Sequence, residues 1–531
     1  MILFKRAMMA MVVASLMLLL CLSQALSQEA TAKGKKAKAA TGQADSGQAA
    51  SKPGAGKASA KEITRGALED NLTLLNQWGG QPEHVQRMYE AAYKVLAAKP
   101  NATFADVAAD AEIQRLCAAK GIVHLGGPML GAVTSDGARV WLRTVRPASV
   151  EVRVTIDGSE KTFGPVKSTL ETDLAAVVPV TGLEPLTHYP YSVLVDGKPI
   201  FAKNIPKHAS IYTAPDPARP GTVRIAFGSC QHRWGLGNGA QADLIRSREP
   251  AGLLLMGDIA VQDRKAHMGL ARADYLLRDF MPAWQDLVAA VPVFATWDDH
   301  DYYANDASGT KGGITPETQA DIWDVFRHAW NNPAYGFGQP RRGVFLRTRL
   351  GPCDVIMTDN RYFRGNKEAF LGEEQLKWLQ EQLLQCQGPF IILSCGTMWS
   401  DYVSEGKDSW GVFDPEGRER IFSLIEQKMI AGVLLISGDR HGARGFRIPR
   451  PSGFNFYEFG AASLGGRRGP PETDPSWTTQ FYHLAGQYAF GEFTIDATAA
   501  DPTVVFRLIR EDGNVVHELK LTRSQLTPPG K

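Results

Sequence analysis

Neither sign of charge dominates this chain of 531 residues. Lysine and arginine together number 58 and aspartate and glutamate 56, so the formal net charge is only +2. A balance this even gives no electrostatic reason to expect a nucleic-acid or membrane partner. The hydrophobic share of 44% and the charged share of 21% are ordinary for globular proteins, and the length leaves room for several domains. Composition therefore predicts no nucleic-acid-specific binding, and by itself it indicates no activity.

The N-terminal apolar run is too short for a membrane span. It covers residues 7–20, whereas a spanning helix needs ~20 apolar residues. The run follows two basic residues and precedes Ala25-Leu26-Ser27, which places small side chains at the two positions that a signal peptidase reads. We therefore predict a signal peptide over residues 1–27 and no stable membrane span after its cleavage. The expected location is periplasmic, cell-surface or extracellular.

Cysteine is scarce, with six residues in the whole chain, of which five remain after such a cleavage. An odd number in an exported protein leaves at least one thiol unpaired or bound to a metal. We assign this role to Cys230. The sequence leaves open whether any of the others pair, namely Cys117, Cys353, Cys386 and Cys395.

The first third of the chain changes composition in steps. Residues 28–61 are rich in alanine, glycine, serine and lysine, which predicts a low-complexity, flexible linker. Residues 62–121 repeat apolar side chains at helical spacing and predict a short helical segment. Residues 124–216 carry short alternating strands and Asp-Gly turns, which predict an all-β immunoglobulin-like or fibronectin-like sandwich. No grouping of catalytic residues occurs in these segments.

Residues 221–523 alternate buried-type strands with helices. Apolar runs of strand length occupy residues 223–227, 253–256, 291–295, 355–357, 390–393 and 433–436. Helical patterns lie between them, and alternating strands return after residue 454. We predict a layered α/β domain in which the C-terminal strands complete a second sheet.

A polar cluster follows each of the six apolar runs. The clusters are Gly228-Ser229-Cys230, Gly257-Asp258, Trp297-Asp298-Asp299-His300-Asp301, Asp359-Asn360-Arg361, Cys395-Gly396 and Gly438-Asp439-Arg440-His441. In open α/β sheets the carboxyl ends of the strands line the ligand crevice. Each cluster alone has a structural explanation, such as a turn or a core cysteine. All six together predict one active site.

Aspartate and histidine gathered at strand ends are typical ligands of divalent and trivalent cations. Several carboxylates that converge without a cation repel one another. Two cations that share a carboxylate remove this repulsion, provide a hydroxide nucleophile and clamp a phosphoryl oxygen. The guanidinium of Arg361 would then hold the remaining phosphate oxygens. The pattern predicts a metal-dependent phosphoesterase.

Four of these motifs, in their order along the chain, resemble those of the alkaline phosphatase D family, the PhoD-like metallophosphatases. They are Phe227-Gly228-Ser229-Cys230-Gln231, Met256-Gly257-Asp258, Trp297-Asp298-Asp299-His300-Asp301 with Asn305-Asp306, and Ser437-Gly438-Asp439-Arg440-His441. The resemblance runs from residue 125 to the C-terminus. It implies a calcineurin-like metallophosphoesterase β-sandwich flanked by helices. It also implies hydrolysis of a phosphate ester, of the alkaline phosphatase or phosphodiesterase type.

The resemblance further implies two metal sites that share the carboxylate of Asp258. The first, where the family holds ferric iron, would add Cys230 and His441. The second, where the family uses calcium, would add Asp299, Asp439 and Asn305.

The same resemblance implies roles for two further residues. His300 would contact the phosphate or protonate the leaving oxygen, and Asp301 would orient its ring. Together with Arg361, these are the predicted catalytic residues.

One position departs from the family pattern. Val261 stands three residues after Asp258, where the family usually places an iron-binding tyrosine. Gln262, Asp263 or water would have to substitute, or the metal differs. We therefore expect iron or zinc at the first site and little tyrosinate absorption.

Two functions remain open at this point. The first is an exported phosphoesterase, which the retained Cys230, Asp258, His300 and His441 favour. The second is a catalytically degenerate relative that binds metal or phosphate without turnover, which Val261 favours.

Overall fold

The computed structural model describes residues 66–200, 209–365, 370–402, 409–466, 469 and 473–530. The predicted signal peptide and linker, residues 1–61, lie outside the described residues. The described chain belongs to one unit, residues 60–531. Within it, no helix combines the length and the apolar character needed to cross a membrane.

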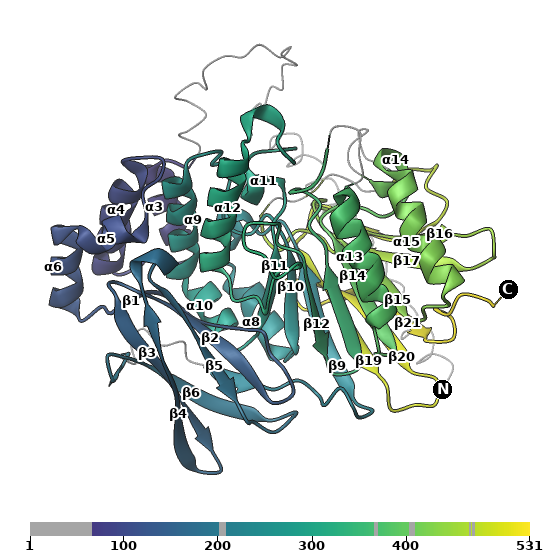
Figure 1. Ribbon diagram of the computed structural model, residues 1–531, viewed down its shortest axis with the longest axis horizontal. Coiled ribbons are helices and arrows are strands. Elements are labelled where there is room, and N and C mark those ends of the chain that lie inside the picture. The colour runs from purple at the N-terminus through teal and green to yellow at the C-terminus, as the bar shows by residue number, and fades with distance from the viewer. Residues whose placement is uncertain are drawn as a thin grey trace, which may run out of the picture. The chain divides into compact units, whose positions relative to one another are not determined.

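Helices come first in the described chain. They are α3 (Leu68–Gln77), α4 (Glu83–Ala97), α5 (Phe104–Ala109) and α6 (Ala111–Lys120). Helix α4 buries Tyr89, Ala92 and Leu96 in a core shared with helix α9 (Met268–Phe280). Figure 1 shows α3 and α4 beside α9. The segment thus packs on the domain that carries the site.

The next region, from residue 123 to residue 212, is built of strands. One sheet has the order β1-β2-β5, and the other has the order β4-β3-β6-β7 with β8 beside β6. Their bounds are β1 (His124–Gly131), β2 (Gly137–Thr144), β3 (Ala148–Ile156), β4 (Ser159–Ser168), β5 (Ala175–Thr181), β6 (His188–Val195), β7 (Lys198–Pro199) and β8 (Ser210–Tyr212). The tight turn Asp157-Gly158 joins β3 to β4, and both turn residues have positive φ, as a two-residue hairpin requires. The region is all-β as predicted, and its immunoglobulin-like character stays a prediction.

Two large sheets form the remaining domain. The first has the order β11-β10-β9-β19-β20-β21, and the second has the order β12-β13-β14-β15-β17-β16-β18. The strands of the first are β9 (Thr222–Gly228), β10 (Gly252–Met256), β11 (Val293–Thr296), β19 (Ala489–Asp496), β20 (Thr503–Arg510) and β21 (Val515–Thr522). Those of the second are β12 (Leu346–Leu350), β13 (Cys353–Met357), β14 (Phe390–Cys395), β15 (Val433–Ser437), β16 (Ala443–Pro449), β17 (Asn455–Gly460) and β18 (Gln480–Leu484).

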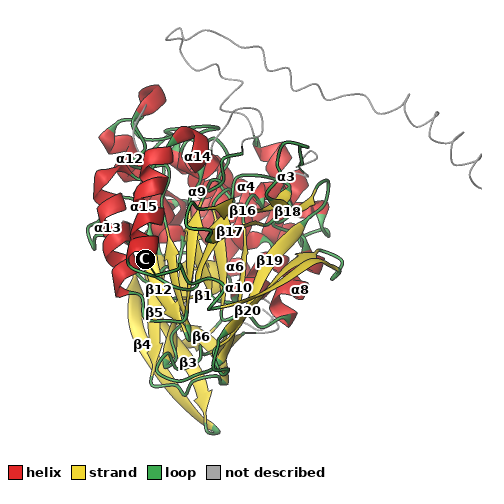
Figure 2. Cartoon of the chain, turned by 90° about the vertical axis from the view of Figure 1, so that its right-hand side faces the viewer, coloured by secondary structure: helices red, strands yellow, loops and turns green. Residues whose placement is uncertain are grey.

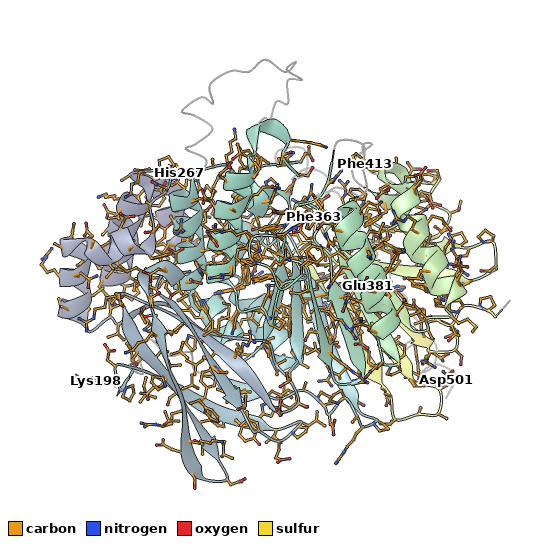
Figure 3. The ribbon with its side chains drawn as sticks, viewed as in Figure 1. Lys198, His267, Phe363, Glu381, Phe413 and Asp501 are labelled. Atoms are coloured by element: carbon orange, nitrogen blue, oxygen red, sulfur yellow. The ribbon has the colours of Figure 1, made fainter. Side chains whose placement is uncertain are left out.

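The two sheets face each other and helices cover their outer faces (Figures 1 and 2). Leu254 and Met256 of β10 join the core between the sheets, whereas Leu253 and Leu255 face the helices. Helices α9, α10 (Pro282–Val288) and α12 (Pro316–Ala329) cover the first sheet, and α13 (Gly372–Gln385) and α15 (Pro415–Gln427) cover the second. Side chains fill the space between these layers (Figure 3). A strand buried on both faces has to be apolar throughout, which explains the continuous apolar runs of the sequence.

The predicted fold class is confirmed. All six apolar runs form strands, namely β9, β10 and β11 in the first sheet and β13, β14 and β15 in the second. Within each sheet these neighbours run parallel. The C-terminal strands β19 to β21 complete the first sheet through antiparallel pairing of β19 with β9. The polar clusters after the parallel strands therefore meet at one edge of the sandwich.

Candidate metal centre

The ends of the parallel strands are tied together by backbone contacts. The N–H of Cys230, after β9, donates to the carbonyl of Gly257, after β10, at 3.1 Å. A Cβ atom at Gly257 would lie 2.3 Å from the backbone nitrogen of Asp298. The φ of Gly257 is +92°. Glycine is required here because the end of β10 presses against the end of β11 and adopts a left-handed conformation. This crowding brings Cys230, Asp258 and Asp298 into one small volume.

The first group of possible ligands consists of Cys230, His232 and His441. One donor atom from each lies within 4.8 Å of the others. Cys230 and His232 are buried, and His441 is partly exposed. Burial, together with the charges of Asp258 and Asp439, raises the pKa of the Cys230 thiol well above its ordinary value. The group offers one sulfur and two ring nitrogens, a set typical of zinc and related transition metals.

The second group consists of carboxylates. Oxygens of Asp258, Asp298, Asp299 and Asp439 lie within 4.8 Å of one another. Burial raises the pKa of Asp258 well above its ordinary value, and Asp298 and Asp299 raise it further. An all-oxygen set of this kind suits calcium, magnesium or manganese.

Asp258 connects the two groups. Its Oδ2 lies 3.8 Å from the sulfur of Cys230, and its side chain also belongs to the carboxylate group. Its Oδ1 is buried and has no hydrogen-bond partner among the described residues. A buried carboxylate oxygen without a donor is stabilised by a cation. The residues thus fit cations on both sides of Asp258, and its sharing by two metal ions stays a prediction.

Arg361 is buried against two of these carboxylates. Its side chain is only 1% exposed and its Nε donates to Oδ1 of Asp298, while Nη2 lies 4.0 Å from Asp299. The geometry favours Arg361 as a residue that neutralises and positions Asp298. Its contact with the substrate stays a prediction.

His300 is held by a residue that the sequence did not single out for this role. Its Nδ1 donates to Oδ1 of Asp263 at 2.6 Å. Burial alone lowers the pKa of His300, but the carboxylates of Asp258, Asp263 and Asp299 raise it to about 11. The predicted partner, Asp301, instead accepts hydrogen bonds from the backbone N–H groups of Asp258 and Asp298. The orientation of His300 is therefore corrected from Asp301 to Asp263.

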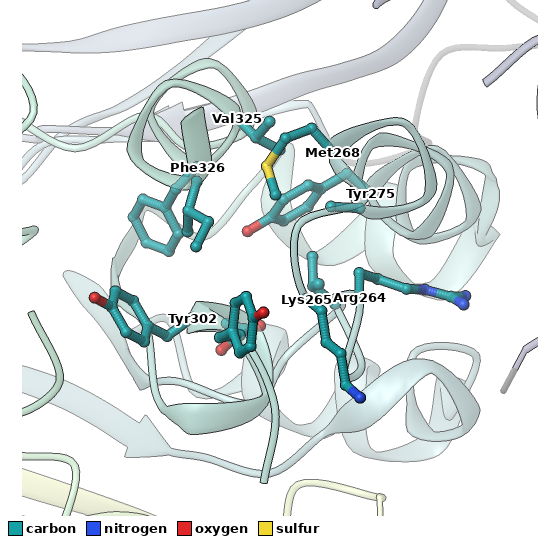
Figure 4. Close-up of a pocket in the computed structure, with 12 residues that line it drawn as sticks. Arg264, Lys265, Met268, Tyr275, Tyr302, Val325 and Phe326 are labelled. Carbon is teal, nitrogen blue, oxygen red and sulfur yellow. The ribbon is translucent and has the colours of Figure 1, made fainter. Parts of the chain in front are cut away.

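Three other residues in or beside the sequence motifs are Asn305, Tyr302 and Val261. Asn305 is exposed, and its backbone N–H donates to Oδ1 of Asp263 at 2.9 Å. The hydroxyl of Tyr302 donates to the carbonyl of Gly309 at 2.8 Å. Val261 lines a small cavity of about 10 Å³, beside labelled side chains such as Met268, Tyr275 and Phe326 in Figure 4. The role of Asn305 as a metal ligand stays a prediction.

All five cysteines in the described residues are free: Cys117, Cys230, Cys353, Cys386 and Cys395. Cys230 differs from the other four because only its thiol lies in a group that could hold a metal, as far as the described residues show.

The comparisons with known proteins agree with this geometry. Residues 271–506 match the family model described as PhoD-like phosphatase. The PhoD-like match includes Asp299, His300, Asp439 and His441, whereas Cys230 and Asp258 precede it. The all-β region, residues 123–212, matches a domain of unknown function. No curated protein matches the sequence significantly.

Solved structures resemble the fold. The structure of PhoD is 17% identical, covers 76% of this chain and 91% of its own, and superposes with a TM-score of 0.60. A dimetal phosphatase from Danio rerio is 14% identical over 57% of this chain and 100% of its own, with a TM-score of 0.35. The first similarity shows that the chain has the fold of PhoD.

Two residues of the groups were not among the predicted ligands. Asp298 stood in the recognised Trp297-to-Asp301 cluster, but only the structure shows that its carboxylate joins those of Asp258 and Asp439. His232 was overlooked altogether. The spacing Cys230-Gln231-His232 is the signal that could have identified it.

Proposed function

We propose that this protein is an exported, metal-dependent phosphoesterase. The observation that carries the proposal is the contact, at 3.8 Å, between Asp258 of the all-oxygen group and Cys230 of the sulfur–nitrogen group. Groups of different chemistry suit two different ions side by side. The chemistry that such ions supply when bound is Lewis-acid activation of water and of phosphoryl oxygens. The PhoD-like match over residues 271–506 supports a phosphate ester as the substrate.

His300 is the residue placed to handle the proton of the leaving group. Asp263 fixes its ring through Nδ1 at 2.6 Å, and its side chain stays partly exposed. A histidine that is fixed on one side and accessible on the other is the usual arrangement of a general acid. We infer that His300 donates a proton to the leaving oxygen or stabilises its developing charge.

Arg440 is better placed than Arg361 to contact the substrate. Its side chain is 17% exposed and its Nε lies 3.5 Å from Oδ2 of Asp439, a carboxylate of the second group. A partly exposed guanidinium beside the centre could bind the non-bridging phosphate oxygens through its planar fork of donors. Arg361 would hold the carboxylate of Asp298 in position through its buried hydrogen bond.

The purified chain should hydrolyse a chromogenic phosphate monoester, a diester or both, and lose this activity on treatment with a chelator. Their relative rates define the substrate class. A degenerate relative would bind metal and show no turnover of either ester, which refutes the proposed enzyme while leaving the metal centre intact. Export predicts that the protein isolated from its host begins near Gln28.

A further inference from the structure

His232 has an unsatisfied nitrogen in the interior of the centre. The residue is 2% exposed, and its Nε2 has no hydrogen-bond partner among the described residues. A buried polar atom without a partner destabilises the fold, because it has lost its hydrogen bonds to water. The sulfur of Cys230 and a ring nitrogen of His441 belong to the same group, within 4.8 Å. Three potential metal-binding atoms therefore lie close together, and one of them, Nε2 of His232, has no hydrogen bond to a described residue.

The backbone at Cys230 and His232 adopts a strained, left-handed conformation. Cys230 has φ of +54° and His232 has φ of +50°, two left-handed residues within three positions. A non-glycine residue keeps such a conformation only where the surrounding structure holds it. Two bonds hold it here. The N–H of His232 donates to the carbonyl of Asp258 at 2.8 Å, and the hydroxyl of Ser463 donates to the carbonyl of Cys230 at 2.6 Å.

Gln262 contacts the other ring nitrogen of His232. The amide oxygen of Gln262 lies 2.7 Å from Nδ1 of His232, and its amide nitrogen lies 2.9 Å from Nδ1 of His300 and 3.4 Å from Oδ2 of Asp263. Nδ1 of His232 therefore has a hydrogen-bond partner, whereas Nε2 has none among the described residues. A histidine whose far nitrogen is held by a hydrogen bond is the usual form of a metal ligand.

The ring is also locked in place. It stacks on Trp234 with a centroid separation of 5.0 Å and an interplanar angle of 14°.

We propose that His232 is a metal ligand, which completes a Cys230–His232–His441 donor set with Asp258 at the first site. The second imidazole would take the place of the tyrosine ligand that Val261 cannot provide. A set of one thiolate and two imidazoles favours a borderline divalent ion of the zinc class. The inference rests on the proposed function only in that both require a metal at this centre.

The chelator-treated full-length protein, titrated with Co²⁺, tests the assignment without any ester. We expect a thiolate-to-cobalt charge-transfer band in the wild type and its loss in Cys230→Ser. His232→Gln should weaken Co²⁺ binding at least about 10–100-fold and change the ligand-field spectrum. His517→Gln is the matched control, because His517 also has a buried Nε2 without a partner but lies on β21, outside both ligand groups. It should bind Co²⁺ as the wild type does.

X-ray absorption of the wild-type protein with one equivalent of Zn²⁺ decides the question even if His232→Gln fails to fold. We expect one sulfur and two imidazoles around the metal. A single imidazole, or a His232→Gln variant with wild-type affinity and spectrum, overturns the proposal. Two imidazoles in a protein that hydrolyses no phosphate ester would leave this inference standing and refute the proposed function instead.

Discussion

Replacing the shared carboxylate separates what the centre contributes to catalysis from what it contributes to stability. Asp258→Asn keeps the shape of the side chain and removes its charge. If Asp258 belongs to both metal sites, the variant should lose metal and lose at least about a hundredfold in kcat/KM, which corresponds to about 2.7 kcal/mol of transition-state stabilisation. Metal analysis and an ester assay measure the two losses.

In the metal-free protein, the same replacement should increase stability. Burial, with Asp298 and Asp299 nearby, raises the pKa of Asp258 well above its ordinary value of 3.8. A carboxyl whose pKa is raised by folding binds more protons in the folded state, so the free energy of unfolding falls as pH rises above 3.8. Asp258→Asn removes this dependence and lets the amide donate to a neighbouring carboxylate. We expect metal-free Asp258→Asn to be about 1–3 kcal/mol more stable than metal-free wild type at pH 8.

Thermal unfolding in a chelator at pH 5 and pH 8 checks this expectation. Asp354→Asn is the control, since Asp354 is buried on β13 but accepts hydrogen bonds from the N–H groups of Gln387 and Gly388 and pairs with Arg347. That variant should lose about 1–3 kcal/mol of stability and keep its metal. If Asp258→Asn kept wild-type turnover, or were the less stable protein without metal, the reasoning would be refuted.

The other predictions concern single residues and the N-terminus. Arg440→Gln should raise KM for a phosphate ester and leave metal content unchanged, whereas Arg361→Gln should lower stability and metal content; equal effects on KM would contradict the distinction. Asp263→Asn should lower the pKa of His300 and reduce kcat about tenfold or more at unchanged metal content, and a wild-type pH–rate profile would argue against that role. N-terminal sequencing of the native protein should begin near Gln28, and an intact initiator methionine would refute export. The iron-loaded protein should show no resonance Raman phenolate modes, and a purple protein that shows them would contradict the loss of the tyrosine ligand.

The strands were predictable because a strand buried on both faces has an uninterrupted run of apolar residues in the sequence. Residues 253–256 were predicted from four consecutive apolar side chains, and β10 covers Gly252–Met256. The positions of the polar clusters followed, since parallel strands end at one edge. The sequence thus predicts Cys230 and Asp258 in one centre, where their side chains lie 3.8 Å apart.

The contacts inside the centre were not predictable, because they depend on backbone conformation and on distant loops. His232 reaches the centre through left-handed residues that need neither glycine nor asparagine, so the sequence carries no sign of them. His300 and Asp263 are 37 residues apart in the chain, whereas Asp301 is its neighbour. Sequence proximity therefore pointed to the wrong partner. The sequence also gave no sign that Arg361 forms a buried ion pair with Asp298.

The N-terminal helices take part in the centre through the residue next to His232. Asn71 of α3 accepts a hydrogen bond from Nη1 of Arg233 at 2.6 Å, and both side chains are buried. Arg233 also lies 3.6 Å from Asp274 of α9, which Arg264 pairs with at 2.6 Å. Helix α3 and the short helix α7 (His232–Gly235) are thus joined by one connection of hydrogen bonds and ion pairs. Free-energy coupling is reciprocal, so an ion bound by His232 would also strengthen the docking of α3, and loosening α3 would weaken the binding of the ion.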